Sequence, residues 1–360
     1  MKTNSLLRRH SSIAKILRKI FLYLFLGKNN YPLIFHKYKE SDNIYKYKSE
    51  NLYVHIPFCR SICFHCPYNK IIYSKVKLKL YEKAVIREIN NYLNHKCIPL
   101  IKTMYFGGGT PSMAPETIKK IINVVRPYFA KKVEIGIEVH PKDASVNFFQ
   151  KLKKYGVNRI SLGIETFKEE LLREIGRDYT SKEAKLAIIN AQKVKFECTD
   201  VNLVYGIPGQ KIQYSIDDIK ECLDLEVDHL SAYPLITFEH TPLGKFVRQG
   251  KFREYNDKNL SLIQNEISKL CISNGYRRTS VWSFTKKNSD GYSTVTRENY
   301  IGFGPGAGSK VNGIFWFNTF SVDEYIKLKH PRPSIILETT DEFRRLHWLY
   351  WQIYKTVIDI

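Results

Sequence analysis

The sequence lacks the features that mark a membrane-spanning or a disulfide-stabilised protein. The apolar run near the N-terminus, Ile20 to Leu26, is far shorter than the roughly 20 apolar residues that span a bilayer. No small-residue cleavage site follows this run, which argues against a secretory signal. The seven cysteines are odd in number and unevenly spaced, so they do not form a disulfide framework.

Acidic residues are scarce relative to basic ones. The chain carries 57 Lys and Arg against 35 Asp and Glu, a formal net charge of +22. Such a balance raises the question of nucleic-acid binding. The lysines are spread along the whole chain, however, which is typical of a solvated surface, so a nucleic-acid partner is not expected. An anionic substrate, such as a tetrapyrrole with several carboxylates, would also suit a basic cleft.

Residues 1–50 differ in pattern from the rest of the chain and are expected to form a basic N-terminal extension. Basic residues such as Arg8, Arg9 and Lys15 precede the short apolar run, as in a basic amphipathic helix. The apolar side of that helix could pack against the folded core, which is the interpretation we favour. It could instead rest on an anionic membrane surface, as a peripheral contact.

From Leu52 onward, short β-prone runs alternate with helical stretches, a pattern typical of βαβ units and a parallel sheet. With 360 residues the chain can hold a (β/α) barrel and a smaller appendage. The expected strands are 52–56, 103–106, 134–139, 159–163, 199–204 and 229–233. The expected helices are 75–97, 115–129, 145–154, 168–175, 181–195 and 212–225. Six such repeats predict an α/β fold, a partial (β/α)6 barrel over residues 51–240 whose chemistry lies on the loops after the strands.

After about Thr237 this alternation stops. The pattern predicts a helix near 255–274, then a glycine-rich segment from Tyr300 to Ser309, then a helix over 340–356 capped at Thr340. Residues 241–360 are therefore predicted to be a short, mostly helical C-terminal extension.

The stretch around which the chain is organised contains Cys59, Cys63 and Cys66, in a CxxxCxxC spacing directly after a β-prone run. Three thiolates on one tight loop can hold three corners of an iron–sulfur cube, since soft sulfur ligands suit such clusters. Because the loop offers three ligands rather than four, one iron is left open to a small molecule. A cluster of this kind needs a reducing compartment, so we expect a cytoplasmic protein.

Two alternatives to a cluster are a zinc site and isolated buried cysteines. Zinc would need a fourth protein ligand. His65 lies between two of the cysteines and is too cramped to share their metal, and His55 could serve only if the strand end bent back. We therefore favour the cluster.

The cysteine spacing, with the longer string Tyr-Val-His-Ile-Pro-Phe-Cys from Tyr53 to Cys59, resembles radical S-adenosylmethionine (SAM) enzymes. Within them it resembles the oxygen-independent coproporphyrinogen III oxidase branch. This resemblance covers roughly Leu52 to Gly308. It implies a six-stranded open barrel, a 4Fe-4S cluster on the three cysteines, and SAM bound at the open iron. It further implies that an electron, from a donor such as flavodoxin or ferredoxin, cleaves SAM to a 5′-deoxyadenosyl radical.

Further matching motifs imply the SAM contacts. The loop Phe106-Gly-Gly-Gly-Thr-Pro-Ser resembles the family's glycine loop, and its Gly108, Gly109 and Thr110 are expected to engage the amino end of SAM. Consecutive glycines allow positive φ and bring backbone N–H groups close to a ligand. Glu138, at the end of the third strand, matches a SAM-binding glutamate. Tyr53, together with Phe58, is expected to shield the cluster from solvent.

Two matching motifs depart from the family pattern. Gly163-Ile-Glu-Thr-Phe has Glu165 where Gln is usual, and Arg177 matches the arginine that reaches the SAM carboxylate through a bidentate contact. The added charge of Glu165 could pair with Arg177. In the stretch beginning at Asp200, Asn202 replaces the aspartate expected to hold the ribose hydroxyls, although Asn can still accept one such bond and donate another.

The reaction is less specified. Coproporphyrinogen oxidases share an additional cysteine two places after the third cluster ligand. This chain has Pro67-Tyr68 there instead. Oxidative decarboxylation of coproporphyrinogen III is therefore not the reaction that we expect. We expect a radical SAM enzyme acting on a tetrapyrrole or related substrate. The alternatives are a haem chaperone and a two-SAM radical methyltransferase with a non-porphyrin substrate. The segment Tyr292–Tyr300 differs from the corresponding stretch of the chaperones and favours an enzyme. The resemblance also implies that residues 241–360 are an abbreviated or truncated C-terminal domain, and no catalytic residue is assigned.

Overall fold

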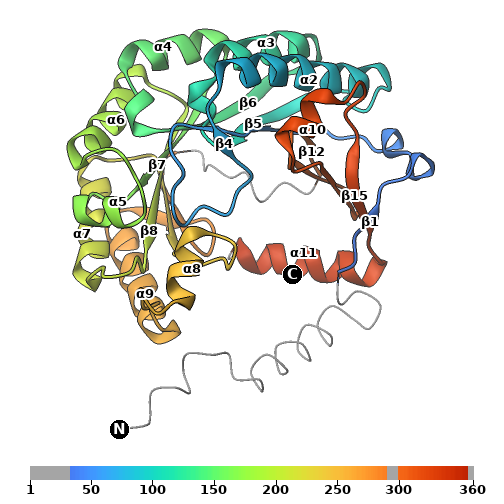
Figure 1. The fold of residues 1–360 in the computed structure, drawn as a ribbon. Coiled ribbons are helices and arrows are strands. Elements are labelled where there is room, and N and C mark those ends of the chain that lie inside the picture. The colour runs from blue at the N-terminus through green and yellow to red at the C-terminus, as the bar shows by residue number, and fades with distance from the viewer. Residues whose placement is uncertain (1–32, 290–298, 356–360) are drawn as a thin grey trace.

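The computed structural model describes residues 33–289 and 299–355. The predicted amphipathic helix and most of the segment Tyr292–Tyr300 lie outside the described residues. A nine-stranded sheet in the order β10-β11-β9-β8-β7-β6-β5-β2-β12 forms the centre of the molecule, and helices cover its outer face (Figure 1).

Six neighbouring strands of this sheet run parallel to one another, and they are the six strands that the sequence predicts. Their bounds are β2 (Asn51–Ile56), β5 (Ile101–Gly108), β6 (Phe129–Val139), β7 (Arg159–Glu165), β8 (Cys198–Tyr205) and β9 (His229–Pro234). Each is followed by helix before the next, as a parallel sheet requires. The predicted α/β fold with a partial barrel is therefore confirmed.

Three of the six helices between these strands begin at a Ser or Thr whose side chain caps the helix. The Ser74 hydroxyl accepts a hydrogen bond from the Lys77 N–H at the start of α2, and Thr180 forms a capping box with Glu183 at the start of α6. The bounds are α2 (Lys75–Asn94), α3 (Pro115–Val125), α4 (Val146–Tyr155), α5 (Glu169–Glu174), α6 (Ser181–Val194) and α7 (Ile212–Asp224).

The two edges of the parallel sheet are extended by later parts of the chain. The short strand β12 (Ile301–Phe303) pairs parallel with β2, and β11 (Ser283–Lys286) pairs antiparallel with β9, with β10 (Tyr276–Arg278) outside it. Within the described residues β10 and β12 end the sheet and do not pair with each other, so the barrel is open.

A second sheet packs beside the first and contains three of the six C-terminal strands, in the order β1-β15-β14-β13. β1 (His36–Lys37) comes from the N-terminal extension and pairs antiparallel with β15. The other strands are β13 (Gly308–Val311), β14 (Ile314–Asn318) and β15 (Pro333–Glu338). The helices after residue 240 are α8 (Pro242–Arg248), α9 (Asp257–Ser273), α10 (Val322–Lys327) and α11 (Asp341–Tyr354).

The C-terminal extension thus contains the two helices predicted near 255–274 and 340–356, with Thr340 capping α11 by accepting from the Phe343 N–H. It also contains six strands that the sequence pattern did not predict. These strands are short, three to six residues, and β11 and β12 pair with distant strands of the parallel sheet, so their local pattern is weak.

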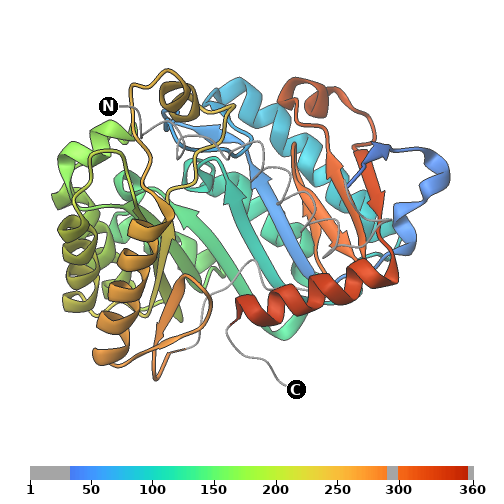
Figure 2. The same cartoon turned by 90° about the horizontal axis from the view of Figure 1, so that it is seen from below.

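The core lies between the parallel sheet and its helices. Val54, Phe106 and Ile137 are fully buried and lie side by side in register on β2, β5 and β6. Strands buried on both faces are the rule for parallel sheets covered by helices. Figure 2 shows α11 running along the side of the molecule from the second sheet toward the opposite sheet edge. Among the described residues, no helix is long and apolar enough to cross a membrane.

Candidate functional site

The cysteine loop, Cys59 to Cys66, leaves the sheet directly after β2. Its base is closed by β3 (Phe58–Cys59), which pairs with β4 (Ile71–Ile72), and the Tyr73 N–H donates to the Cys59 carbonyl at 2.9 Å. Neighbouring elements hold its tip: the Phe64 N–H donates to the Ile175 carbonyl at 3.0 Å, and the Phe64 carbonyl accepts from the Leu243 N–H at 2.9 Å. The loop is therefore anchored at its base by strands and at its tip by α8 and the turn after α5.

All three cysteines line one cavity of about 1000 Å³. Its wall also contains seven of the other eight predicted site residues: Gly108, Gly109, Thr110, Glu138, Glu165, Arg177 and Asn202. They come from the ends of β5, β6, β7 and β8 and from the turn after α5. Sites far apart in the sequence thus meet because parallel strands end at the same edge of the sheet.

The glycine loop after β5 packs directly against the cysteine loop. The Gly109 N–H donates to the Ile56 carbonyl and the Thr110 N–H to the Phe58 carbonyl, both at 2.8 Å. A Cβ on Gly109 would lie 2.9 Å from the Phe58 backbone, so only glycine permits this approach. The Thr110 hydroxyl lies 3.5 Å from the Cys59 sulfur. The N–H groups of Gly109 and Thr110 already donate hydrogen bonds within the protein. This loop therefore offers a ligand its backbone carbonyls and a surface that its glycines leave without side chains.

Glu138 lies at the end of β6 and faces the glycine loop. One carboxylate oxygen accepts the Tyr105 hydroxyl at 2.9 Å and the other accepts the Gly108 N–H at 3.2 Å. Burial raises the pKa of Glu138 to about 7, against the effect of these two donors. This carboxylate therefore sits near its titration point at neutral pH.

Arg177 and Glu165 form an ion pair in the cavity wall, as the added charge of Glu165 allowed. Their side chains are only 15% and 10% exposed, respectively. Glu165 has a φ of +59° at a β-bulge of β7, which turns its side chain out of the regular strand pattern. Burial raises the pKa of the Cys63 thiol, and the Arg177 cation opposes that rise. The guanidinium therefore acts electrostatically on a cysteine of the loop as well as on its carboxylate partner.

Asn202 and Asp200 lie on the same face of β8 and share one partner. The Asn202 amide donates to the Ser161 hydroxyl at 2.6 Å, and Ser161 donates to the Asp200 carboxylate at 2.8 Å. Ser231 donates to the other Asp200 oxygen at 3.2 Å. Burial raises the pKa of Asp200 to about 7. The carboxylate missing at position 202 is thus present two residues earlier on the same wall.

Tyr53 is the one predicted site residue outside the lining of the cavity. Its hydroxyl donates to the His55 ring at 2.9 Å, and its ring stacks on Tyr105 with centroids 6.4 Å apart. Phe58 is fully buried and packs edge-on against Tyr81, so it belongs to the core. His55 is itself buried and engaged, so no bend of the strand end brings it to the cysteines.

The cavity also has lining residues that the sequence did not single out. Tyr105 and Asp200 are two of them, and Asp200 stands two residues before Asn202 on β8, a period of two that could have found it. Trp282 and Tyr354 form another part of the wall, with ring centroids 5.7 Å apart. For these two the sequence holds no signal, because α11 reaches the barrel only through the tertiary fold.

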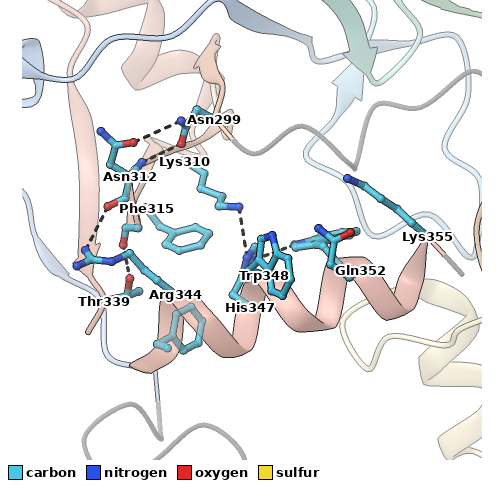
Figure 3. A pocket seen from close by; sticks show the side chains of 13 residues that line it. Asn299, Lys310, Asn312, Phe315, Thr339, Arg344, His347, Trp348, Gln352 and Lys355 are labelled. Carbon is cyan, nitrogen blue, oxygen red and sulfur yellow. Dashed lines mark hydrogen bonds between the residues drawn. The ribbon is translucent and has the colours of Figure 1, made fainter. Parts of the chain in front are cut away.

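A second, smaller cavity of about 200 Å³ lies between α11 and the second sheet (Figure 3). Lys310 Nζ lies 3.3 Å from His347 Nδ1, and the Trp351 indole N–H donates to His347 Nε2 at 2.9 Å. Trp351 and Lys355 line both cavities, so α11 forms a wall between them. No predicted site residue lines this smaller cavity.

Comparison with known proteins agrees with this geometry. The model of the radical SAM superfamily matches residues 53–222. The heme chaperone HemW of Bacillus subtilis is 30% identical, over 78% of this chain and 76% of that protein. The oxygen-independent coproporphyrinogen III oxidase of Pseudomonas aeruginosa is 25% identical, over 76% of this chain and 64% of that protein. The solved structure of coproporphyrinogen III oxidase (HemN) from Escherichia coli aligns with a TM-score of 0.76 at 22% identity, over 88% of this chain and 78% of that one, a likeness in fold.

The chain belongs to the radical SAM superfamily. Within it, the chain falls in the branch of HemN and HemW homologues, which confirms the resemblance seen in the sequence. The cofactors of this radical SAM protein are a 4Fe-4S cluster and SAM.

The residues of the cavity fit both cofactors. Among the described residues, no three His, Cys, Asp or Glu side chains converge closely enough to hold a single metal ion. A cube places each of three sulfurs on a different iron and so needs less convergence. The buried Arg177 Nε and His65 Nδ1 make no hydrogen bond to any described residue, and both residues line the cavity, so polar groups remain for a ligand. The spacing thus suits a cluster better than a zinc ion.

Proposed function

We propose that this radical SAM protein is an enzyme that cleaves SAM reductively to a 5′-deoxyadenosyl radical and uses it on a tetrapyrrole or related substrate. One observation carries the proposal. A single cavity of about 1000 Å³ is lined by the three cysteines and by seven of the eight residues expected to bind SAM. Cys59, Cys63 and Cys66 hold the cluster, which supplies the electron for cleavage when bound.

The other residues bind and orient SAM. Arg177 pairs with its carboxylate, for which a planar guanidinium is suited. Gly108, Gly109 and Thr110 offer a close backbone surface beside the cysteine loop. Glu138 accepts from the amino group, and the ribose hydroxyls meet the polar wall at Asn202. These contacts would orient SAM beside the cysteine loop and keep water out.

The size and chemistry of the cavity support a substrate larger than a metabolite of a few atoms. Small-molecule sites are typically about 300–1,000 Å³. This cavity is at the upper end of that range, which leaves room beside SAM. Part of its wall carries Arg277, Arg278, Lys355 and the aromatic rings of Trp282 and Tyr354. Cations beside aromatic faces suit a planar ring system with carboxylate arms.

A second candidate is a haem chaperone. It is favoured by the 30% identity to the heme chaperone HemW, and by Tyr68 at the position where coproporphyrinogen oxidases resemble each other in an additional cysteine. Tyr68 is 65% exposed at the cavity wall. A chaperone would bind haem in stoichiometric amount and pass it on without altering it. An electron donor such as flavodoxin or ferredoxin belongs to the enzyme proposal alone.

Anaerobic reconstitution separates the candidates. Reduced protein is incubated with labelled SAM, alone and with haem or coproporphyrinogen, and the products are analysed. The enzyme proposal expects 5′-deoxyadenosine and an altered tetrapyrrole. Unaltered haem that is bound one per chain and handed to an apo-acceptor would favour the chaperone. Cys63→Ala should abolish cleavage, whereas Cys97→Ala, at a fully buried cysteine away from the cavity, should not. Intact SAM in the presence of a full cluster would overturn the enzyme proposal.

A further inference from the structure

The glycine-rich segment Tyr300–Ser309 has no place in the cavity, since none of its residues lines it. It nevertheless presses against both ends of the cysteine loop. Gly304 has a φ of +100°, and a Cβ there would lie 2.4 Å from the His55 carbonyl oxygen. Gly306 has a φ of +75°, and a Cβ there would lie 2.7 Å from the Asn69 amide nitrogen. His55 precedes the loop and Asn69 follows it, so the glycines permit contact with its entry and its exit.

Hydrogen bonds join these contacts into one chain. The Asn69 side-chain amide donates to the Pro305 carbonyl at 2.9 Å, and the Asn69 carbonyl lies 2.7 Å from His55 Nε2. Because a carbonyl can only accept, His55 Nε2 carries the proton and Nδ1 accepts from the Tyr53 hydroxyl at 2.9 Å. His55 is 3% exposed, and burial lowers its pKa to about 4, consistent with this neutral tautomer.

The glycine segment is held on its other side by Glu88 of α2. One Glu88 oxygen accepts the Gly304 N–H at 3.0 Å and the Tyr325 hydroxyl at 2.5 Å. The Asn318 amide bridges the other Glu88 oxygen, at 2.8 Å, and the Gly304 carbonyl, at 2.9 Å. Glu88 is fully buried. Both polar groups of Gly304 are therefore bound to elements of the scaffold, and the segment is a rigid support.

We propose that Asn69 is a positioning residue for the iron–sulfur cluster, and that the glycine segment, held by Glu88, braces the cysteine loop through it. The brace fixes where the loop leaves the strand and where it returns, and so fixes the spacing of the three sulfurs. The Lys70 ammonium adds a direct contact by donating to the Cys66 carbonyl at 2.7 Å. The proposal rests on the cluster of the proposed function but not on SAM cleavage or on the substrate.

The test measures how firmly the holoprotein keeps its cluster. Wild type, Asn69→Ala and Glu88→Gln are reconstituted anaerobically, and loss of iron to a ferrous chelator is followed by the cluster's visible absorbance. Asn90→Ala, at an exposed asparagine of α2, is the matched control. We expect Asn69→Ala to lose iron about 10-fold faster or more, the range typical of outer partners of metal ligands. Glu88→Gln should act in the same direction and less strongly, and Asn90→Ala should match wild type.

A double variant and a spectroscopic signature separate positioning from general destabilisation. If Glu88 acts through Asn69, the double variant should lose iron no faster than Asn69→Ala. In Asn69→Ala, the electron paramagnetic resonance signal of the reduced cluster should be shifted from the wild-type signal. This shift should be present well below the melting temperature of the variant protein. Wild-type iron loss and an unshifted signal in Asn69→Ala would overturn the proposal, as would independent effects of the two changes. If Asn69→Ala does not fold, the test rests on Glu88→Gln alone. Iron loss from Glu88→Gln at the wild-type rate would then overturn the proposal. Because iron retention is measured, a protein that never cleaves SAM still answers the question.

Discussion

Replacing Glu165 by Gln should tighten SAM binding. Arg177 is paired with Glu165, so under the proposed function the SAM carboxylate shares a guanidinium that already has a carboxylate partner. Two carboxylates on one guanidinium lie about 5 Å apart, and at an effective dielectric constant of about 20 they repel by about 3 kcal/mol. The pair is 15% and 10% exposed, so solvent screens only part of this repulsion. We expect binding about 10- to 100-fold tighter, equivalent to about 1.4–2.8 kcal/mol.

The same change should lower the stability of the SAM-free protein. Glu165→Gln leaves the Arg177 cation in the wall without its partner, which costs of the order of 3 kcal/mol for a buried pair. SAM supplies a new carboxylate, so the melting temperature should fall without SAM and rise more steeply as SAM is added. Isothermal titration and thermal unfolding over a SAM series measure the two effects. Glu266→Gln, in an exposed pair with Lys269, is the control and should leave both unchanged.

Tighter SAM binding together with a lower melting temperature of the SAM-free protein would indicate that Glu165 and SAM compete for Arg177. Weaker or unchanged SAM binding in Glu165→Gln would refute the reasoning, because it would mean that Glu165 itself contacts SAM or that Arg177 does not. A fall in stability with no gain in affinity would identify the pair as purely structural.

Further predictions concern the cluster, the ribose wall and pH. Cys66→Ala should remove most of the brown chromophore and iron, and chromophore retained at the wild-type level would contradict the cluster assignment. The double change Asp200→Asn/Asn202→Asp moves the carboxylate along β8 and should tighten SAM binding more than either single change, as titration calorimetry can test. Burial raises the pKa of Glu88 from 4.5 to about 7, so the unfolded chain ionises first and stability falls by up to roughly 3 kcal/mol as pH rises across that window. Glu88→Gln should flatten the dependence of the free energy of unfolding on pH in this window, as denaturant titrations at several pH values measure. An unchanged slope against pH would show that Glu88 does not titrate there.

Local sequence patterns predicted the parallel strands well because each carries its own signal. A run such as Leu52–Ile56 is apolar and β-prone, and the segments between strands have helical period and caps such as Thr180. The ends of those strands also carry the site residues, so the cavity follows from the alternation of strand and helix. This is why seven of eight expected SAM residues line one cavity.

The strands after residue 240 were not predicted, for a physical reason. Strands such as β11 and β12 are four and three residues long and pair with β9 and β2, which lie far away in the sequence. Short stretches of this kind have no period of their own, and their conformation is decided by the edge to which they pair.

The amino-acid order alone determined that three sulfurs stand on one loop, that a glycine turn and a glutamate follow at strand ends, and that an arginine stands twelve residues after Glu165. It did so because local spacing and strand-end position are properties of neighbouring residues. Only the tertiary structure decided that Glu165 pairs with Arg177, that Ser161 links Asn202 to Asp200, and that Gly304 packs against the strand that leads into the cysteine loop. The partners lie from 12 to more than 200 positions apart in the sequence, so local spacing does not specify these contacts and the packing of the whole fold selects them.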